Sequence, residues 1–558
     1  MTSAFRSSLA VLLSCLGSSL GRAQCLDWAP GFDLQGVNSD VDALAVFDDG
    51  SGPALFAGGQ FTTAGFVTAN FIARWDGANW SAVGGGASSS VRALAVYDDG
   101  SGPALYAGGD FSVMGGVAVN GIAKWDGTAW SAVGGGVNGY VSELGVFDDG
   151  SGPGLYAGGS FTSAGGVSAS RIARWNGSSW SALGTGIAGP STVESMAVFD
   201  DGAGPALYVG GTFLSAGGIT ANRIARWNGS AWSSLGSGTS CWVAALAVFD
   251  DGAGPALYAG GCFATAGGVA VNYVARWKSG TWSAVAGGMG GGGGLPYVHA
   301  LAVFDDGAGA ALYAAGGFTT AGGAGAARIA KWDGGVWTPL GGGLSGGPVT
   351  PLAISMAAFD DGTGGGPDLY VGGRFETAGA FPSLGFAEWR GCASGESFCF
   401  GDGTTATPCP CGNTGLPGSG CENSSATGGA QLSVTGLPSL TNDTIVFTAS
   451  GERPTALSIF LQGNTEFAGG IPFGDGVRCI GGVLKRLFVR NAVGGTVAAP
   501  VGGDPSVHVR SRALGDGITS AQSRSYQVYY RDNVLTFCPS PAGNAWNVGH
   551  AVRLTWIP

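Results

Sequence analysis

Histidine is scarce in this sequence, which has only three among 558 residues: His299, His508 and His550. Sites that hold transition metals or move protons near neutral pH usually draw on histidine. The sequence also lacks an HExxH motif and a phosphate-binding loop with its lysine. A G-x-S-x-G pattern at 343–347 lies in a glycine-rich loop, without the strand–turn–helix context of a hydrolase nucleophile. No familiar catalytic motif therefore stands out.

Charged residues are also few, at 11% of the chain, and the acidic ones dominate, giving a net charge of −12. An acidic surface disfavours nucleic acids and anionic membranes as partners, because both are polyanions. Beyond the N-terminus no apolar run reaches the roughly 18 residues needed to span a bilayer. We expect no nucleic-acid partner and no membrane span, whereas cations and neutral ligands such as glycans are less disfavoured.

The first 23 residues have the pattern of an export signal. Arg6 supplies a positive charge, Leu9 to Leu20 form an apolar stretch, and residues 21–23 offer a small-x-small cleavage site. In an alternative interpretation, residues 12–15 are a lipobox and Cys15 carries a lipid anchor. Both interpretations predict an exported protein that is extracellular or held at the cell surface.

What the sequence has in abundance is glycine, with 109 residues, and internal repetition. Seven similar units begin at Val41, Val91, Val141, Val193, Val243, Val298 and Ala353. Each contains four runs rich in β-branched and aromatic residues, and Asp-Gly or Asn-Gly between the last two favours a tight hairpin. Four antiparallel strands per unit predict an all-β fold, a seven-bladed β-propeller over residues 24–392. The alternative is a superhelical solenoid, whose repeats are mostly shorter.

The units resemble kelch repeats. The resemblance rests on a glycine doublet followed by spaced aromatics such as Trp75 and Trp80, and it covers about residues 28–392. The sixth unit departs from it, because Ala315-Gly316 replaces the doublet. The resemblance implies a propeller and carries little information about function, because propellers host many activities.

The seventh unit ends at Cys392 without a fourth run. The segment after Cys25 supplies a matching one, because Trp28 corresponds to Trp80 of the first unit. We expect the N-terminus to complete the seventh blade and hide two sheet edges. A disulfide between Cys25 and Cys392 would replace the missing turn and contribute about 4–5 kcal/mol in the chain-entropy model.

Ten cysteines remain after removal of the signal, an even number that indicates disulfides in an exported protein. Cys241 and Cys262 are expected on paired strands, which makes a bridge between them plausible. A compact set could bind zinc, but export favours two disulfides: Cys399, Cys409, Cys411 and Cys421. Pairing of Cys409 with Cys411 would be strained, so two connectivities stay open. The remaining two cysteines, Cys479 and Cys538, then pair by elimination.

The C-terminal part has no repeat. Residues 393–424 form a connector rich in Gly, Pro and Cys, and residues 425–558 contain short strand-like runs that favour a β-sandwich-like domain. The segment from Phe398 to Ser424 resembles a cysteine-rich module at the C-termini of exported bacterial proteins. That resemblance implies an extracellular or surface context.

An Asp-Asp-Gly loop recurs in all seven units, as in Asp48-Asp49 and Asp98-Asp99. One interpretation is that these loops bind calcium, which takes about six to eight oxygen ligands. The other is a turn capped by the aspartates, each turn pairing with one cation per unit: Arg74, Lys124, Arg174, Arg226, Arg276 and Lys331. We favour the turn.

The second position of each unit varies while its neighbours are nearly uniform: Asp42, Arg92, Ser142, Glu194, Ala244, His299 and Ile354. It opens the innermost strand at the face opposite the Asp loops. Relaxed constraint at a solvated channel mouth is one explanation. The other is an asymmetric ligand site with polar contacts from Asp42, Arg92, Ser142, Glu194 and His299.

These features favour a non-catalytic exported binding or adhesion protein, with a glycan or surface polymer as its ligand. One alternative is a glycan-active lyase or hydrolase with Asp42 and Glu194 as the acid/base pair, excluded as a hydrolase beyond about 10 Å separation. Another is a structural cell-envelope protein with calcium-stabilised loops. A copper-radical oxidase, known on kelch-like propellers, would need a Tyr/His cluster that three scattered histidines do not provide.

Overall fold

The computed structural model describes residues 27–291, 297–307, 309–347, 350–361, 367–390, 396–398, 409, 419–421, 423–435, 438–440, 443–473, 476–519, 522–532 and 546–556. Nearly all elements in these ranges are β-strands, and the two helices are short, α1 (Phe32–Gln35) and α2 (Val507–Ala513). No helix in these ranges is long and apolar enough to cross a membrane. The predicted signal, with Cys15, lies outside them.

The first repeat forms a four-stranded antiparallel sheet, blade 1, in the order β2 (Val41–Asp48), β3 (Pro53–Gly59), β6 (Ile72–Trp75) and β7 (Trp80–Ala82). Asp48 pairs with Pro53 across the Asp-Asp-Gly loop, and Trp75 pairs with Trp80 across the Asp-Gly turn. The four predicted strands are therefore confirmed. The connection between β3 and β6 holds an additional short hairpin that was not predicted, β4 (Thr63–Ala64) and β5 (Val67–Thr68).

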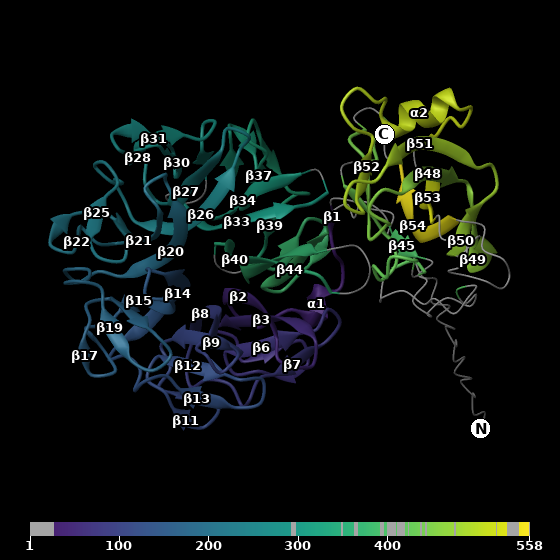
Figure 1. Ribbon diagram of the computed structural model, residues 1–558. Coiled ribbons are helices and arrows are strands. Elements are labelled where there is room, and N and C mark those ends of the chain that lie inside the picture. Colours follow the sequence, from purple (N-terminus) through teal and green to yellow (C-terminus); the bar gives the residue numbers. More distant parts are fainter. Residues whose placement is uncertain are drawn as a thin grey trace, which may run out of the picture.

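Six further sheets repeat this pattern and are called blades 2 to 7. Blade 2 consists of β8 (Val91–Asp98), β9 (Pro103–Gly109), β12 (Ile122–Trp125) and β13 (Trp130–Ala132), and blade 3 of β14 (Tyr140–Asp148), β15 (Pro153–Ser160), β18 (Ile172–Trp175) and β19 (Trp180–Ala182). Blade 4 consists of β20 (Val193–Asp200), β21 (Pro205–Gly211), β24 (Ile224–Trp227) and β25 (Trp232–Ser234), and blade 5 of β26 (Val243–Asp250), β27 (Pro255–Gly261), β30 (Val274–Lys278) and β31 (Thr281–Ala284). Blade 6 consists of β33 (Val298–Asp305), β34 (Ala310–Gly316), β37 (Ile329–Trp332) and β38 (Trp337–Pro339), and blade 7 of β40 (Leu352–Phe359), β41 (Asp368–Arg374), β44 (Phe386–Arg390) and β1 (Asp27–Trp28). Figure 1 shows the sheets around a common centre.

The N-terminal strand completes blade 7, as predicted. β1 pairs antiparallel with β44, placing Asp27 opposite Arg390 and Trp28 opposite Trp389. At the inner edge, β40 of blade 7 contacts β2 of blade 1, and β2 also contacts β8. The disulfide predicted between Cys25 and Cys392 lies outside the described residues and stays a prediction.

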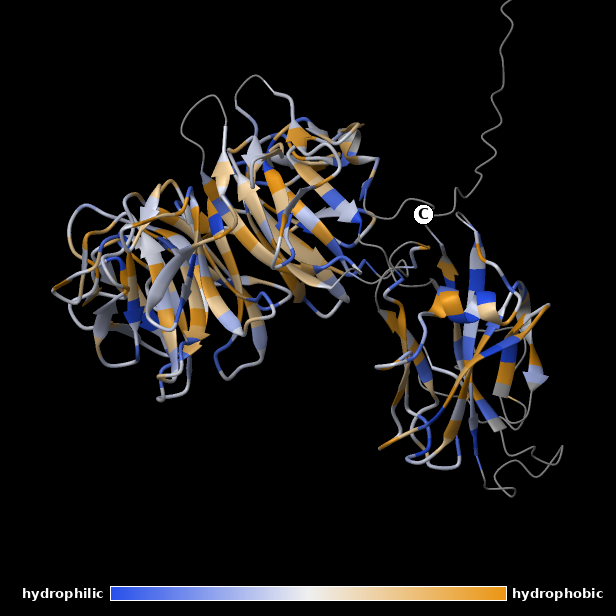
Figure 2. Cartoon of the chain, turned by 90° about the horizontal axis from the view of Figure 1, so that it is seen from above, coloured by the Kyte–Doolittle hydropathy of each residue, from blue (hydrophilic) through white to orange (hydrophobic). Residues whose placement is uncertain are grey.

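The core of the propeller lies between neighbouring blades. Figure 2 shows hydrophobic residues running through the strands of the sheets. The glycine doublet has a steric role there, because a Cβ atom added to Gly58 would lie 2.6 Å from the Cγ1 atom of Val91 in the next blade. Such close approach excludes any side chain at the first glycine of the doublet. In six of the blades the first glycine of the doublet thus makes room for the first valine of the next blade.

The C-terminal part contains two larger sheets. One has the order β45 (Glu396–Phe398), β54 (Trp546–Thr555), β53 (Ser523–Arg531), β48 (Leu457–Gly463) and β51 (Lys485–Asn491), and the other β46 (Gln431–Thr435), β47 (Val446–Ser450) and β52 (Val497–Ala499). A hairpin of β49 (Thr465–Phe473) and β50 (Gly476–Gly481) is added. Phe447 of the second sheet packs against Phe460 and Tyr526 of the first in one buried cluster. This packing is that of a β-sandwich, and β45 comes from the segment expected to be a connector.

Two disulfides are present among the described residues. Cys241 bridges Cys262 in blade 5, as predicted, with Cα atoms 5.4 Å apart. Cys409 bridges Cys421, which selects one of the two connectivities that the sequence left open. Cys479 is also disulfide-bonded, while Cys399, Cys411 and Cys538 lie outside the described residues. Disulfides of this kind fit an exported protein.

The sixth blade offers a test of the interblade fit. Ala315 stands where other blades have the first glycine, and Ala353 stands where the next blade would have valine; both are fully buried in one cluster. The extra methyl on one side is thus matched by a smaller residue on the other. Ala353→Val should destabilise the propeller by about 1–3 kcal/mol through overpacking. Adding Ala315→Gly should recover most of that loss in a double-mutant cycle followed by thermal unfolding. Equal destabilisation of the single and double variants would contradict this fit.

Candidate functional site

Each innermost strand carries a β-bulge at the same place. In blade 1 the pairing passes from Val41–Gly59 to Ala43–Gly58, so Asp42 has no partner on β3. The equivalent unpaired residues are Arg92, Ser142, Glu194, Ala244, His299 and Ile354. A bulge inserts one residue, bends the strand and re-aims its side chain. The position that varies in sequence is therefore the bulge residue of every blade.

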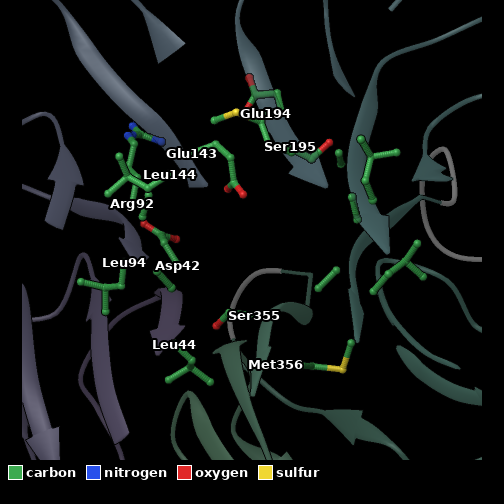
Figure 3. Close-up of a pocket in the computed structure, with 18 residues that line it drawn as sticks. Asp42, Leu44, Arg92, Leu94, Glu143, Leu144, Glu194, Ser195, Ser355 and Met356 are labelled. Atoms are coloured by element: carbon green, nitrogen blue, oxygen red, sulfur yellow. The ribbon is translucent and has the colours of Figure 1, made fainter. Parts of the chain in front are cut away.

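The innermost strands of all seven blades line one cavity with a volume of about 230 Å³. Three of the candidate site residues, Asp42, Arg92 and Glu194, line it, and so does Ala244. Figure 3 shows the carboxylates of Asp42 and Glu143 directed into the open centre. Three of the five polar candidates from the sequence analysis therefore lie at this one cavity.

The other two polar candidates, Ser142 and His299, have different surroundings. Ser142 donates a hydrogen bond of 2.5 Å from its hydroxyl to the carbonyl oxygen of Val193 in the next blade. His299 packs against the rings of Trp242 and Tyr297, with centroids 5.8 and 5.9 Å away. Ser142 therefore contributes to the contact between blades, and His299 belongs to an aromatic cluster.

Glu143 is a site residue that the sequence analysis missed. It stands one position after the bulge of blade 3, where other blades have alanine or serine, such as Ala43 and Ser195. Its carboxylate accepts a hydrogen bond from the backbone N–H of Met196 in blade 4. The replacement of a small residue by glutamate at a repeat position was the signal available in the sequence.

Burial sets the protonation of the three carboxyl groups in the cavity. It raises the pKa of Glu143 to about 8, opposed by the hydrogen bond from Met196 and reinforced by the nearby Glu194. Burial also raises the pKa of Asp42 to about 6, against a hydrogen bond from Gln60, and raises that of Glu194. Near neutral pH, Glu143 can therefore donate a hydrogen bond while Asp42 accepts.

The positive charge at the cavity is already engaged. The Nε atom of Arg92 lies 2.7 Å from a carboxylate oxygen of Asp110, and its guanidinium stacks over the ring of Tyr140 at 5.2 Å. The charge of Arg92 also opposes the rise that burial causes in the pKa of both Asp42 and Glu194. The cavity thus combines carboxyl groups in two protonation states with one held guanidinium, a pattern suited to polar, uncharged ligands.

The Asp loops form the capped and paired turns that the sequence favoured. The Oδ1 atom of Asp48 accepts hydrogen bonds from the backbone N–H groups of Gly50 and Gly52. The second aspartate of each loop pairs with the predicted cation at 2.5–3.7 Å in six blades: Asp49–Arg74, Asp99–Lys124, Asp149–Arg174, Asp201–Arg226, Asp251–Arg276 and Asp306–Lys331.

A cation beside the second aspartate leaves these loops a poor fit for calcium. The hydroxyl of Tyr106 also donates to Asp99, at 2.8 Å, which occupies a further carboxylate lone pair. Nowhere in the described ranges do three His, Cys, Asp or Glu side chains gather as a group that could hold a metal ion. Six of the loops are therefore turns held by an ion pair, and calcium binding stays the alternative interpretation.

Comparisons with known proteins do not assign this chain to a family. No family model matches the sequence, and no curated protein matches it. Among solved structures, the extracellular domain of a hybrid two-component system from B. thetaiotaomicron is similar at 9% identity and a TM-score of 0.20, over 93% of this chain and 75% of that chain. A Trypanosoma rangeli sialidase in complex with 2,3-difluorosialic acid is similar at 11% identity and a TM-score of 0.28, over 94% and 92%. At these scores, fold and site rest on the chain's own sheets and side chains.

The burial of Glu143 predicts a pH-dependent stability. Its pKa lies near 4.5 in the unfolded chain and about 8 in the folded protein, so only the unfolded state loses the proton as pH rises between these values. The group's contribution is therefore fully present below pH 4.5 and is lost as pH rises towards 8. Glu143→Gln should have a melting temperature about 2 °C or more above the wild type at pH 8, and none of this advantage near pH 4.5. The exposed Glu376→Gln is the control, and a pH-independent difference would contradict the assignment.

The ion pairs of the Asp loops predict stability without added metal. Asp306 and Lys331 are only 3% and 14% exposed, so Lys331→Met leaves a buried carboxylate and should cost about 3–5 kcal/mol. Arg92→Met breaks the ion pair with Asp110. The side chains of Arg92 and Asp110 are 40% and 28% exposed, so this variant should lose about 1 kcal/mol of stability or less.

EDTA should leave the melting temperature of the wild type unchanged. A fall of several degrees would favour the calcium interpretation.

Proposed function

We propose that this protein is an exported binding protein that uses the mouth of its propeller channel to hold a glycan or surface polymer. The observation that carries the proposal is the bulge in each innermost strand, because four of the bulge residues, Asp42, Arg92, Glu194 and Ala244, line one cavity with different side chains. A repeat that is otherwise uniform has no structural need for four different residues around that cavity. An asymmetric set of polar groups around a cavity is what recognition of one ligand requires.

The chemistry of the cavity supports an uncharged, hydroxyl-rich ligand. Protonated Glu143 can donate a hydrogen bond, ionised Asp42 can accept one, and Arg92 is held by Asp110. Sugar hydroxyls both donate and accept, so they match such a mixed set. The net charge of −12 disfavours polyanionic ligands at long range.

The finer description of the chain is also a proposal: a kelch-like propeller that follows a cleaved signal peptide, or a lipid anchor at Cys15. The doublet Gly58-Gly59 ends β3, as kelch repeats would have it. The disulfides Cys241–Cys262 and Cys409–Cys421 support export. Residues 1–23, 24–392, 393–424 and 425–558 are the proposed signal, propeller, connector and β-sandwich-like domain.

A second candidate is a glycan-active lyase or hydrolase. The observation in its favour is the separation of two pKa values in one cavity, about 8 for Glu143 and about 6 for Asp42. Such a split is how carboxyl groups divide into a general acid and a general base. Glu194, the predicted partner of Asp42, interacts with Glu143 and Arg92, so the pair Asp42 and Glu143 is the stronger candidate.

One experiment separates binding from catalysis. Mature protein is incubated with insoluble and arrayed polysaccharides, and the supernatant is assayed for new reducing ends and unsaturated sugars. We expect binding without product. Combining Asp42→Asn with Glu143→Gln should weaken binding about tenfold or more, because the loss of two hydrogen bonds to the ligand costs at least about 1.4 kcal/mol. Glu376→Gln is again the control. Product that disappears in the double variant would establish the enzyme, and neither binding nor product would refute both functions.

A further inference from the structure

Trp242 differs from every other tryptophan whose side chain the structure describes, because it is the only one that is not buried. The others within blades 1 to 7 are repeat residues of the third and fourth strands, such as Trp277 and Trp282, and pack between blades. Trp242 instead precedes the first residue of β26, beside the bulge at Ala244. The equivalent positions of other blades hold small, charged or aliphatic residues as well as tyrosine, so the repeat does not require an indole there.

Two further rings lie beside Trp242. The centroid of Tyr297 is 6.2 Å away and that of His299 is 5.8 Å away, and both side chains are partly exposed. Tyr297 precedes β33 as Trp242 precedes β26, so the two rings come from corresponding positions of blades 5 and 6. Burial lowers the pKa of His299, which keeps the imidazole neutral near pH 7. These three residues are called the aromatic cluster.

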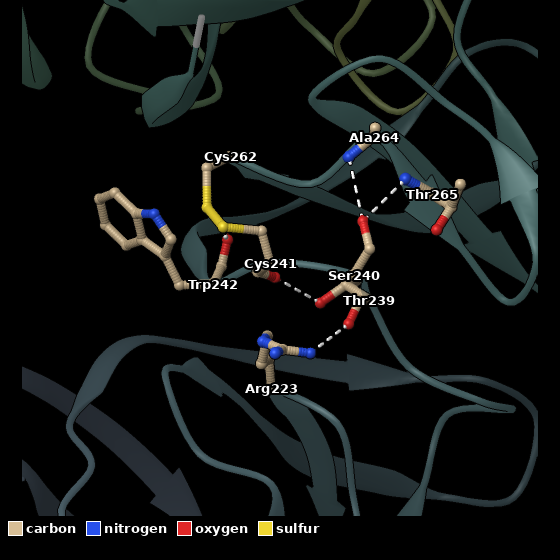
Figure 4. The surroundings of a disulfide bond; sticks show 8 residues. All are labelled: Arg223, Thr239, Ser240, Cys241, Trp242, Cys262, Ala264 and Thr265. Atoms are coloured by element: carbon tan, nitrogen blue, oxygen red, sulfur yellow. Dashed lines mark hydrogen bonds between the residues drawn. A yellow bond between two sulfur atoms is a disulfide. The ribbon is translucent and has the colours of Figure 1, made fainter. Parts of the chain in front are cut away.

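The backbone that carries Trp242 is fixed from several sides (Figure 4). The disulfide ties the preceding residue, Cys241, to Cys262 on the neighbouring chain segment. The hydroxyl of Thr239 donates to the carbonyl of Cys241 at 2.8 Å, and Arg223 of blade 4 donates to the carbonyl of Thr239 at 2.8 Å. In Figure 4 the indole projects away from these contacts. A ring held by so rigid a support loses little conformational entropy when it binds a ligand.

We infer that the aromatic cluster is a stacking subsite for an uncharged pyranose ring at the mouth of the channel. The inference rests on the proposed function and adds the chemical class and the place of contact. Aromatic faces offer large apolar contact area, and the C–H face of a pyranose is its apolar side. The guanidinium that acts on Tyr297 belongs to Arg374, and it is already paired with both carboxylate oxygens of Asp40.

Charge argues for an uncharged ring. The carboxyl groups of the cavity and the acidity of the whole chain oppose uronic acids and other anionic sugars. Cationic sugars would be favoured by the carboxylates, but Glu143 holds its proton near neutral pH and Asp42 faces Arg92. The subsite is thus apolar at the cluster, with donors and acceptors on the cavity side.

The test uses the intrinsic fluorescence of the mature chain and three hexasaccharides: cellohexaose, a glucosamine hexamer and a galacturonic acid hexamer. Acrylamide should quench an accessible tryptophan component that Trp242→Phe removes, because the other described tryptophans are buried. Cellohexaose should protect this component and bind with a Kd that Trp242→Ala raises about tenfold. Trp242→Phe keeps a ring and should bind better than Trp242→Ala.

The control variant is Phe66→Ala, which removes an aromatic side chain that is 85% exposed on blade 1 and should leave binding unchanged. If cellohexaose binds the wild type and Trp242→Ala equally well, the stacking subsite is refuted while the binding function stands. If only the glucosamine hexamer or only the galacturonic acid hexamer binds in a Trp242-dependent way, the assignment of an uncharged ring is wrong. If the wild type binds none of the three, the subsite is refuted, and the polysaccharide panel then decides the proposed function by itself.

Discussion

The hydrogen bond between one tryptophan and the preceding blade is the contact that the ring depends on. The indole N–H of Trp130 donates to the carbonyl of Val83 at 3.2 Å, and its counterparts repeat this bond around the molecule: Trp180–Val133, Trp232–Leu183, Trp282–Leu235, Trp337–Val285, Trp28–Leu340 and Trp80–Gln35. In each case the neighbouring blade supplies the acceptor, so the indole N–H of the fourth-strand tryptophan is satisfied across the blade interface. Because Trp28 makes this bond from the N-terminal strand, the chain terminus is a structural member of the ring.

This contact and the seat that Gly58 provides for Val91 leave little freedom in the repeat. Strand ends, tryptophans and glycines are fixed by the neighbouring blade, and the Asp loops are fixed by their own hydrogen bonds and ion pairs. The bulge residue and the residue that precedes each unit vary most between the blades. Variation in a uniform repeat is therefore concentrated at the start of the innermost strands, where both Asp42 and Trp242 lie.

The sequence predicted what repeats, as well as the varying second position of each unit and the disulfide of blade 5, but it missed some single exceptions. The strands followed from a pattern seen in seven units and the ion pairs of the Asp loops from one seen in six, and the closure by Trp28 followed from the fourth run missing in the seventh unit. Glu143 was missed because a single exception at a uniform position looks like noise, and the backbone group that bonds it, at Met196, belongs to another blade. Neither the aromatic cluster nor the pairing of Cys409 with Cys421 could be read from spacing, because both depend on distances between segments that only the folded chain defines.

The side chains near the channel mouth fall into a polar group and an aromatic group, although the backbone that carries them is nearly symmetric. Blades 1 to 4 contribute Asp42, Arg92, Glu143 and Glu194 to the lining of the cavity, while blades 5 and 6 carry the rings of the aromatic cluster. Polar groups alone would bind a hydrated sugar weakly, because each hydrogen bond replaces one to water. Aromatic rings alone would not orient it. A ligand long enough to cross the mouth would meet both halves, so its apolar face would supply affinity and its hydroxyl groups would supply direction.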